Sequence, residues 1–134
     1  MLQGKAGGNE VKSPEDLIRS GISSFNKGEF YDAHEYLEDA WSDYRLSDAK
    51  LIQGLIQLAV GYFHITNLNI NGARGLFKKC IPKLELFKKN HRGINVQEVL
   101  EVARKAYENV ISIEDVKDFD WTIVPRIEYG GEVV

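Results

Sequence analysis

Apolar residues recur at helical spacing along most of the chain, and turn signals divide them into about five segments. Apolar positions three and four residues apart are typical of helices that bury one face. The predicted helices are residues 13–26, 29–43, 47–66, 69–90 and 95–112. Pro82 is expected to kink the fourth helix or split it in two, because proline lacks the N–H that a helix interior needs. No strand pattern stands out elsewhere, so the sequence predicts an all-α fold.

The predicted organisation is one helical bundle between a loose start and an extended end. Residues 1–12 are rich in glycine, and we expect them to be flexible. Residues 13–134 are predicted to be a single domain, which suits a chain of 134 residues. We expect the tail, residues 113–134, to dock on the bundle through Trp121 and Ile123.

The third predicted helix is the most apolar part of the chain, with no Asp, Glu, Lys or Arg from residue 51 to residue 73. A membrane-spanning helix needs about 20 mostly apolar residues. Here Gln53, Gln57 and His64 interrupt a shorter apolar run. A helix that is apolar on nearly all sides belongs in the centre of a bundle. The sequence therefore predicts a central uncharged helix and no membrane association.

The formal net charge of −3 hides two strongly charged segments. Residues 29–48 carry seven acids and one base, whereas residues 74–92 carry seven bases and one acid. A net acidic chain argues against a dedicated nucleic-acid binder. The acidic second helix and the basic fourth helix are instead candidate faces for a homo-oligomer. A single cysteine, Cys80, excludes an internal disulfide and favours the cytoplasm as the location.

Polar residues interrupt the apolar faces of the second and third predicted helices. His34 lies in the apolar stripe of the second helix, with Glu38 one turn later on the same face. On the third helix, Gln53, Gln57 and His64 share another face. The short connection predicts antiparallel packing, which sets His34 level with Gln57 or Leu58 and Glu38 level with Gln53 or Gly54. A polar cluster between the two helices is therefore expected, with His64 as a neighbour.

Several roles for this cluster remain open. His34, Glu38 and His64 are candidate ligands for a divalent metal ion, since imidazole and carboxylate groups suit such ions. In a catalytic site, hydrolytic in this hypothesis, His34 is the candidate base and Glu38 the group that orients it. Gln53, Gln57 and His64 then complete the binding wall for a small ligand. In a purely structural role, the cluster only fixes how the helices align. The residues do not decide whether the protein is an enzyme.

Two motifs in these segments resemble those of a known family. They are FNxGxFYxxHExxExxW, from Phe25 to Trp41, and QGLIQxA…H…NxxGA, from Gln53 to Ala73. Over about residues 17 to 87 the chain resembles the family called domain of unknown function 309, although Leu68 replaces a glycine that the family usually has. The resemblance implies an all-helical bundle and adds Trp41 to the candidate ligand-binding residues, which are Trp41, Gln53, Gln57 and His64. It implies no reaction.

A second function class also fits the pattern. The turn from Phe25 to Phe30 looks like that of a tetratricopeptide hairpin, and two such hairpins are predicted. The alternative hypothesis is therefore a protein-interaction or oligomerisation module, in which the polar cluster is a buried structural network. Its partner is unknown.

Overall fold

The structure is a computed structural model and describes residues 12–87 and 89–134. Within them the chain forms the α-helices α1 (Pro14–Asn26), α2 (Phe30–Asp43), α3 (Ala49–Thr66), α4 (Ile70–Leu84) and α5 (Val96–Ser112). The predicted all-α class is confirmed. Residues 1–11, most of the start predicted to be flexible, lie outside the described residues.

Local side-chain caps explain why three of the helices begin where they do. The Ser13 hydroxyl accepts a hydrogen bond from the Asp16 N–H (3.1 Å) at the start of α1. Asn69 Oδ1 accepts from the Gly72 N–H (2.9 Å), and Asn95 Oδ1 accepts from the Glu98 N–H (3.1 Å). Such caps satisfy N–H groups that the first turn of a helix leaves without partners.

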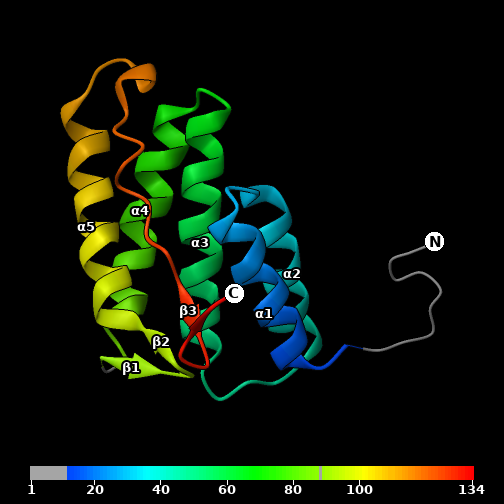
Figure 1. Ribbon diagram of the computed structural model, residues 1–134. Helices are drawn as coiled ribbons and strands as arrows, with labels where there is room; N and C mark the ends of the chain where they lie inside the picture. The colour runs from blue at the N-terminus through cyan, green and yellow to red at the C-terminus, as the bar shows by residue number, and fades with distance from the viewer. Residues whose placement is uncertain (1–11, 88) are drawn as a thin grey trace, which may run out of the picture.

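Helix α3 occupies the centre of the bundle (Figure 1). It packs against α2 on one side and α4 on the other, while α1 covers α2 and α5 covers α4. Ten of its residues are buried, and their apolar side chains form much of the core. The predicted central helix is thus confirmed, and it carries no Asp, Glu, Lys or Arg from Leu51 to Thr66. No helix within the described residues is long and apolar enough to cross a membrane.

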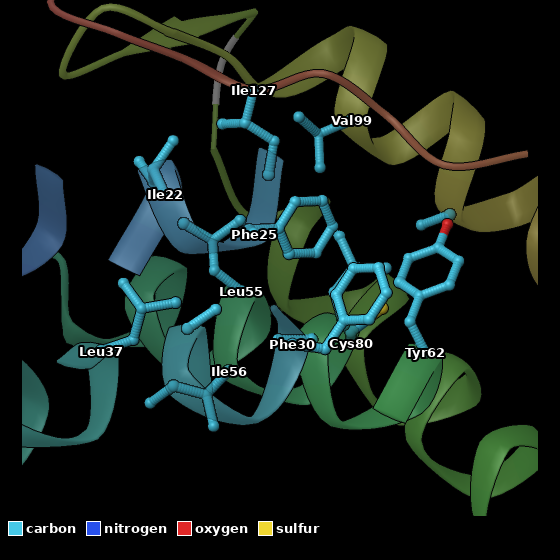
Figure 2. Packing of buried hydrophobic residues seen from close by; sticks show 14 of the residues in the cluster. Ile22, Phe25, Phe30, Leu37, Leu55, Ile56, Tyr62, Cys80, Val99 and Ile127 are labelled. Atoms are coloured by element: carbon cyan, nitrogen blue, oxygen red, sulfur yellow. The ribbon is translucent and has the colours of Figure 1, made fainter. Parts of the chain in front are cut away.

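The core is rich in aromatic rings that contact one another in the C-terminal half of α3 (Figure 2). Tyr62 lies 5.3 Å from Phe30 and 4.9 Å from Phe77 between ring centroids. A Cβ atom at Gly61 would lie 2.6 Å from the Phe77 ring, so the glycine lets α4 approach closely. Cys80 is buried nearby, and burial raises the pKa of its thiol to about 12. Cys80 is therefore an inert core residue, as its apolar neighbours in the sequence predict.

The prediction that the fourth helix continues to residue 90 is wrong. Helix α4 ends at Leu84, two residues after Pro82, and turns follow. Strands β1 (Asn90–His91) and β2 (Ile94–Asn95) then form a short hairpin. Its two turn residues, Arg92 and Gly93, have φ values of 57° and 69°. This is the left-handed conformation that a two-residue hairpin turn requires.

The tail after α5 runs alongside α3 and ends beside α1 (Figure 1). It contains a 3₁₀ turn (Val116–Asp118) and a hairpin of β3 (Glu128–Tyr129) and β4 (Glu132–Val133). The Tyr62 hydroxyl donates a hydrogen bond to the Ile123 carbonyl (2.7 Å). The Asn26 amide donates to the carbonyl of Ile127 (2.8 Å) and accepts from its N–H (2.9 Å). Trp121 stacks on Phe30 but remains about half exposed.

The turn between α3 and α4 closes although Leu68 stands where the resembling family usually has glycine. Leu68 adopts a φ of 59°, which is unfavourable for a side chain with a Cβ atom. Hydrogen bonds from the Leu68 N–H to the Ile65 carbonyl (3.0 Å) and from the Asn69 N–H to the His64 carbonyl (2.8 Å) hold the turn.

Candidate binding site between α2 and α3

A pocket of about 150 Å³ lies between α2 and α3. Helix α2 contributes Glu38 and Trp41, which are three residues apart and so lie on one face. Helix α3 contributes Gln53, Ile56 and Gln57 by the same spacing. We call this the α2–α3 pocket. It brings together four predicted site residues, Glu38, Trp41, Gln53 and Gln57, in the register expected from the short connection.

Gln57 contains a polar atom without a partner. Its Oε1 is buried and accepts no hydrogen bond from the described residues. A buried acceptor left in this state typically costs about 1 to 3 kcal/mol. Gln57 is also one of the residues that line the α2–α3 pocket. The pocket therefore offers an acceptor that a ligand with an N–H or O–H group would satisfy.

The charge of the α2–α3 pocket is negative. Glu38 is the only ionisable residue in its lining, and its side chain is 47% exposed. The flat face of Trp41 adds a surface on which cations are favoured over anions. The pocket thus combines a carboxylate, an aromatic ring and amide oxygens, a set that suits a positively charged group with N–H donors.

His34 lies beside this pocket and does not line it. Its Nδ1 is 3.1 Å from the Tyr31 carbonyl oxygen, which can only accept a hydrogen bond. A proton on Nδ1 leaves the lone pair of a neutral imidazole on Nε2. His34 Nε2 lies 4.0 Å from Glu38 Oε2, too far for a hydrogen bond between them. His34 Nε2 and the Glu38 carboxylate therefore lie close together beside the pocket.

His64 is placed apart from the other predicted residues. Its Nδ1 lies 3.4 Å from the side-chain amide of Asn69, in the turn between α3 and α4. Its ring packs on Gly72, where a Cβ atom would lie 2.8 Å from the His64 Cγ. The motif residues His64, Asn69 and Gly72 thus shape this turn, and His64 does not line the α2–α3 pocket.

The predicted metal ligands His34, Glu38 and His64 do not form a coordination group. Within residues 12–87 and 89–134, no three His, Cys, Asp or Glu side chains gather closely enough to hold a metal ion. His34 and Glu38 alone would supply two ligands, fewer than the three protein ligands typical of a catalytic zinc site. The geometry therefore suits an organic cation better than a divalent metal.

All five residues of the pocket fall within a match to a known family. Residues 18–76 match the model of the domain of unknown function DUF309. This confirms the resemblance predicted from the two motifs. The DUF309 match spans α1 to the first half of α4, so the α2–α3 pocket belongs to it entirely, whereas α5 and the tail lie beyond it.

A curated relative is also uncharacterised. The chain is 26% identical over 107 residues to an uncharacterized protein of Aquifex aeolicus (strain VF5). The aligned part covers 79% of this chain but only 31% of that protein. The chain thus spans about a third of the length of the relative it matches.

A paired polar cluster that sequence reasoning missed joins a residue inside the DUF309 match to two residues beyond it. Asp48, just before α3, is buried and binds Arg92 of the β1–β2 turn through both carboxylate oxygens, with Arg92 Nη2 2.9 Å from Oδ1. His91 Nε2 lies 3.0 Å from Asp48 Oδ2. The bond from Arg92 holds the pKa of the Asp48 carboxyl below its ordinary value. The only sequence signal is the Arg92-Gly93 turn, because the partners are 44 residues apart.

Proposed function

We propose that the DUF309 segment of this protein binds a small organic cation, and that the α2–α3 pocket receives its ammonium or guanidinium group. The observation that carries this proposal is the unpartnered Gln57 Oε1 beside the Glu38 carboxylate and the Trp41 ring. An N–H donor on the ligand supplies the hydrogen bond that Gln57 lacks. Its positive charge is attracted by the carboxylate and the aromatic face.

The volume of the α2–α3 pocket limits how much of the ligand can enter it. Pockets for whole small molecules usually measure about 300 to 1,000 Å³. At about 150 Å³, the α2–α3 pocket suits one charged group, with the rest of the molecule outside. The His34 Nε2 lone pair at the edge provides a further acceptor. The catalytic role predicted for His34 and Glu38 rests on the same lone pair and stays a prediction.

The location of the protein is proposed on separate grounds. A chain with one cysteine forms no internal disulfide. This suits the reducing conditions of the cytoplasm, which we propose as its compartment.

The test is a titration of the ¹⁵N-labelled chain, followed by two-dimensional NMR. The probes are methylguanidinium and methylammonium, with tetramethylammonium as a cation that lacks N–H donors and urea as a neutral donor. We expect the first two to shift the Trp41 indole signal and the side-chain amide signals of Gln53 and Gln57. Tetramethylammonium and urea should shift them far less, because each lacks one of the two required features.

Variants locate the effect. Glu38→Gln and Gln57→Met should each weaken binding of methylguanidinium about tenfold, since each removes one charge-assisted or buried hydrogen bond. Glu35→Gln is the matched control, because it makes the same charge change at an exposed position of α2 that does not line the pocket. Equal weakening by Glu35→Gln and Glu38→Gln, or unchanged Trp41 and Gln57 signals, would contradict the proposal. Signals that move on dilution without any ligand would favour the interaction-module alternative.

A further inference from the structure

A second and larger pocket lies on the other side of α2, against α1 and the end of the tail. Its volume is about 350 Å³. The residues that matter for its chemistry are Arg19, Ser20, Ser23 and Ser24 of α1, Lys27 directly after α1, and Tyr36 of α2. Val134 forms one edge, where its main-chain oxygen accepts a hydrogen bond from the Asn26 amide (3.1 Å). We call this the α1–α2 pocket.

The serines of this pocket do not bond to their own helix. Two hydroxyls in other helices donate to a carbonyl one turn back, Thr66 to Phe63 (2.6 Å) and Ser112 to Asn109 (2.8 Å). The hydroxyl of Ser24 makes no such bond and has no other hydrogen-bond partner among the described residues, although Ser24 is only 8% exposed. Ser24 also lines the α1–α2 pocket, and a hydroxyl without a protein partner in a pocket lining is available to a ligand as donor or acceptor.

The pocket also holds two cations that form no ion pair within the described residues. Arg19 of α1 and Lys27, the residue that follows α1, both line the pocket. The Arg19 guanidinium lies 5.4 Å from the centroid of the Tyr129 ring, which restricts its position. Lys12 Nζ lies 5.6 Å from the Tyr36 ring, so a third cation is near the pocket. The acidic residues of α2, from Asp32 to Asp43, do not line it.

We propose that the α1–α2 pocket binds the phosphate group of a small organic phosphate. A phosphate has several acceptor oxygens, which match a guanidinium, an ammonium group and several hydroxyls as donors. The volume reaches the lower end of the range typical of small-ligand pockets, about 300 Å³, so an organic part fits beside the phosphate. This site is independent of the α2–α3 pocket, and it has the opposite charge preference.

The experiment titrates the full ¹⁵N-labelled chain with glycerophosphate, inorganic phosphate and acetate in turn. We expect the backbone signals of Ser20, Ser23, Ser24 and Lys27 to shift, with an affinity order of glycerophosphate, then phosphate, then acetate. The signals of Trp41 and Gln57 should stay in place. Those two signals report the α2–α3 pocket, so failure here and failure of the proposed cation binding are distinguishable.

Two variants and a control test the assignment. Arg19→Gln/Lys27→Gln should weaken glycerophosphate binding about tenfold or more by removing both charges. Ser24→Ala should weaken it about fivefold, the loss expected for one hydrogen bond, while the fold is kept because the hydroxyl has no partner among the described residues. Lys78→Gln/Lys79→Gln makes the same charge change on exposed residues of α4 and should alter affinity by less than about twofold.

Three results would overturn the proposal. The first is the absence of shifts at the α1 serines with any phosphate probe. The second is equal loss of affinity in the Arg19/Lys27 and Lys78/Lys79 variants, which indicates diffuse charge attraction. The third is acetate binding as tightly as glycerophosphate, which indicates a carboxylate site.

Discussion

The α2–α3 pocket and the Asp48–Arg92 cluster both place polar side chains against the apolar core. They differ in whether the polar atoms of these side chains have hydrogen-bond partners. In the cluster, both Asp48 oxygens have partners, and Arg92 also lies 3.7 Å from Glu15 and 3.5 Å from the Tyr129 hydroxyl. In the pocket, Gln57 Oε1 has no partner among the described residues. His34 Nε2 and Glu38 Oε2 lie 4.0 Å apart without a hydrogen bond.

This difference indicates different roles. A buried charge is tolerated when its partner and hydrogen bonds are in place, and its removal then leaves the partner uncompensated. The Asp48–Arg92 cluster thus holds the β1–β2 turn against the start of α3. An acceptor left without a partner adds nothing to stability and is available to a ligand. The contrast predicts that a substitution which removes a polar group lowers the free energy of unfolding in the Asp48–Arg92 cluster. In the α2–α3 pocket, the same kind of substitution raises it.

The largest effect is expected in the cluster. Asp48→Asn should lower the free energy of unfolding by about 3 kcal/mol, because it leaves the Arg92 guanidinium, which is largely buried, without its anion. Urea denaturation measures the loss. Glu15→Gln removes the more distant and exposed partner of Arg92 and should cost less than about 0.5 kcal/mol. Similar small losses for both variants would show that the cluster does not hold the fold.

The same ion pair predicts a dependence of stability on pH. The pKa of Asp48 is lowered in the folded protein, so in acid the unfolded chain takes up the proton more readily. The contribution of the Asp48 ion pair to stability is complete above the ordinary carboxyl pKa of 3.8. It is lost as the pH falls through the lower pKa that Asp48 has in the folded protein. Melting temperatures measured from pH 7 to about pH 2 should therefore decline less steeply below pH 4 in Asp48→Asn than in the natural chain. Parallel declines would contradict the role assigned to Asp48.

The pocket should respond in the opposite direction. Gln57→Met keeps the length and shape of the side chain and removes an unpartnered buried oxygen, so it should raise the free energy of unfolding by about 1 kcal/mol. Gln53→Met, in the same helix and pocket, removes no buried unpartnered atom and should give no such gain. A loss of stability in Gln57→Met would mean that the amide is paired in the folded protein, and the contrast between the two regions would fail.

The smallest effect separates backbone strain from side-chain pairing. Leu68 and Arg92 have nearly the same φ, 59° and 57°. Leu68 is 60% exposed, so Leu68→Gly relieves the backbone with little loss of packing and should stabilise the protein by about 0.5 kcal/mol. Arg92→Gly makes the same backbone change but loses the bond to Asp48, so it should destabilise. Thermal unfolding of both variants checks the signs, and equal signs would refute the explanation.

The helices and the pocket follow from local rules, whereas the cluster does not. Caps at Ser13, Asn69 and Asn95 fix the helix starts, and a short turn fixes the antiparallel register of Glu38 against Gln53. The predicted fourth helix is too long because the chain leaves the helix two residues after Pro82 and leads into the β1–β2 hairpin. The Asp48–Arg92 pair joins residues 44 apart, and no spacing rule specifies such a contact.

His64 shows another limit of helical spacing. It shares a face of α3 with Gln53 and Gln57, yet it packs on Gly72 and lies near Asn69 instead. Helical spacing predicts the side of α3 on which His64 lies. The turn that follows α3 determines which residues the His64 side chain contacts there.

The most direct test of cation binding is a crystal structure of the protein grown with methylguanidinium. We predict the planar cation in the α2–α3 pocket, over the Trp41 ring, with N–H groups donating to Gln57 Oε1 and to the Glu38 carboxylate. A pocket that holds water alone, with the Gln57 amide hydrogen-bonded to protein groups, would contradict the account.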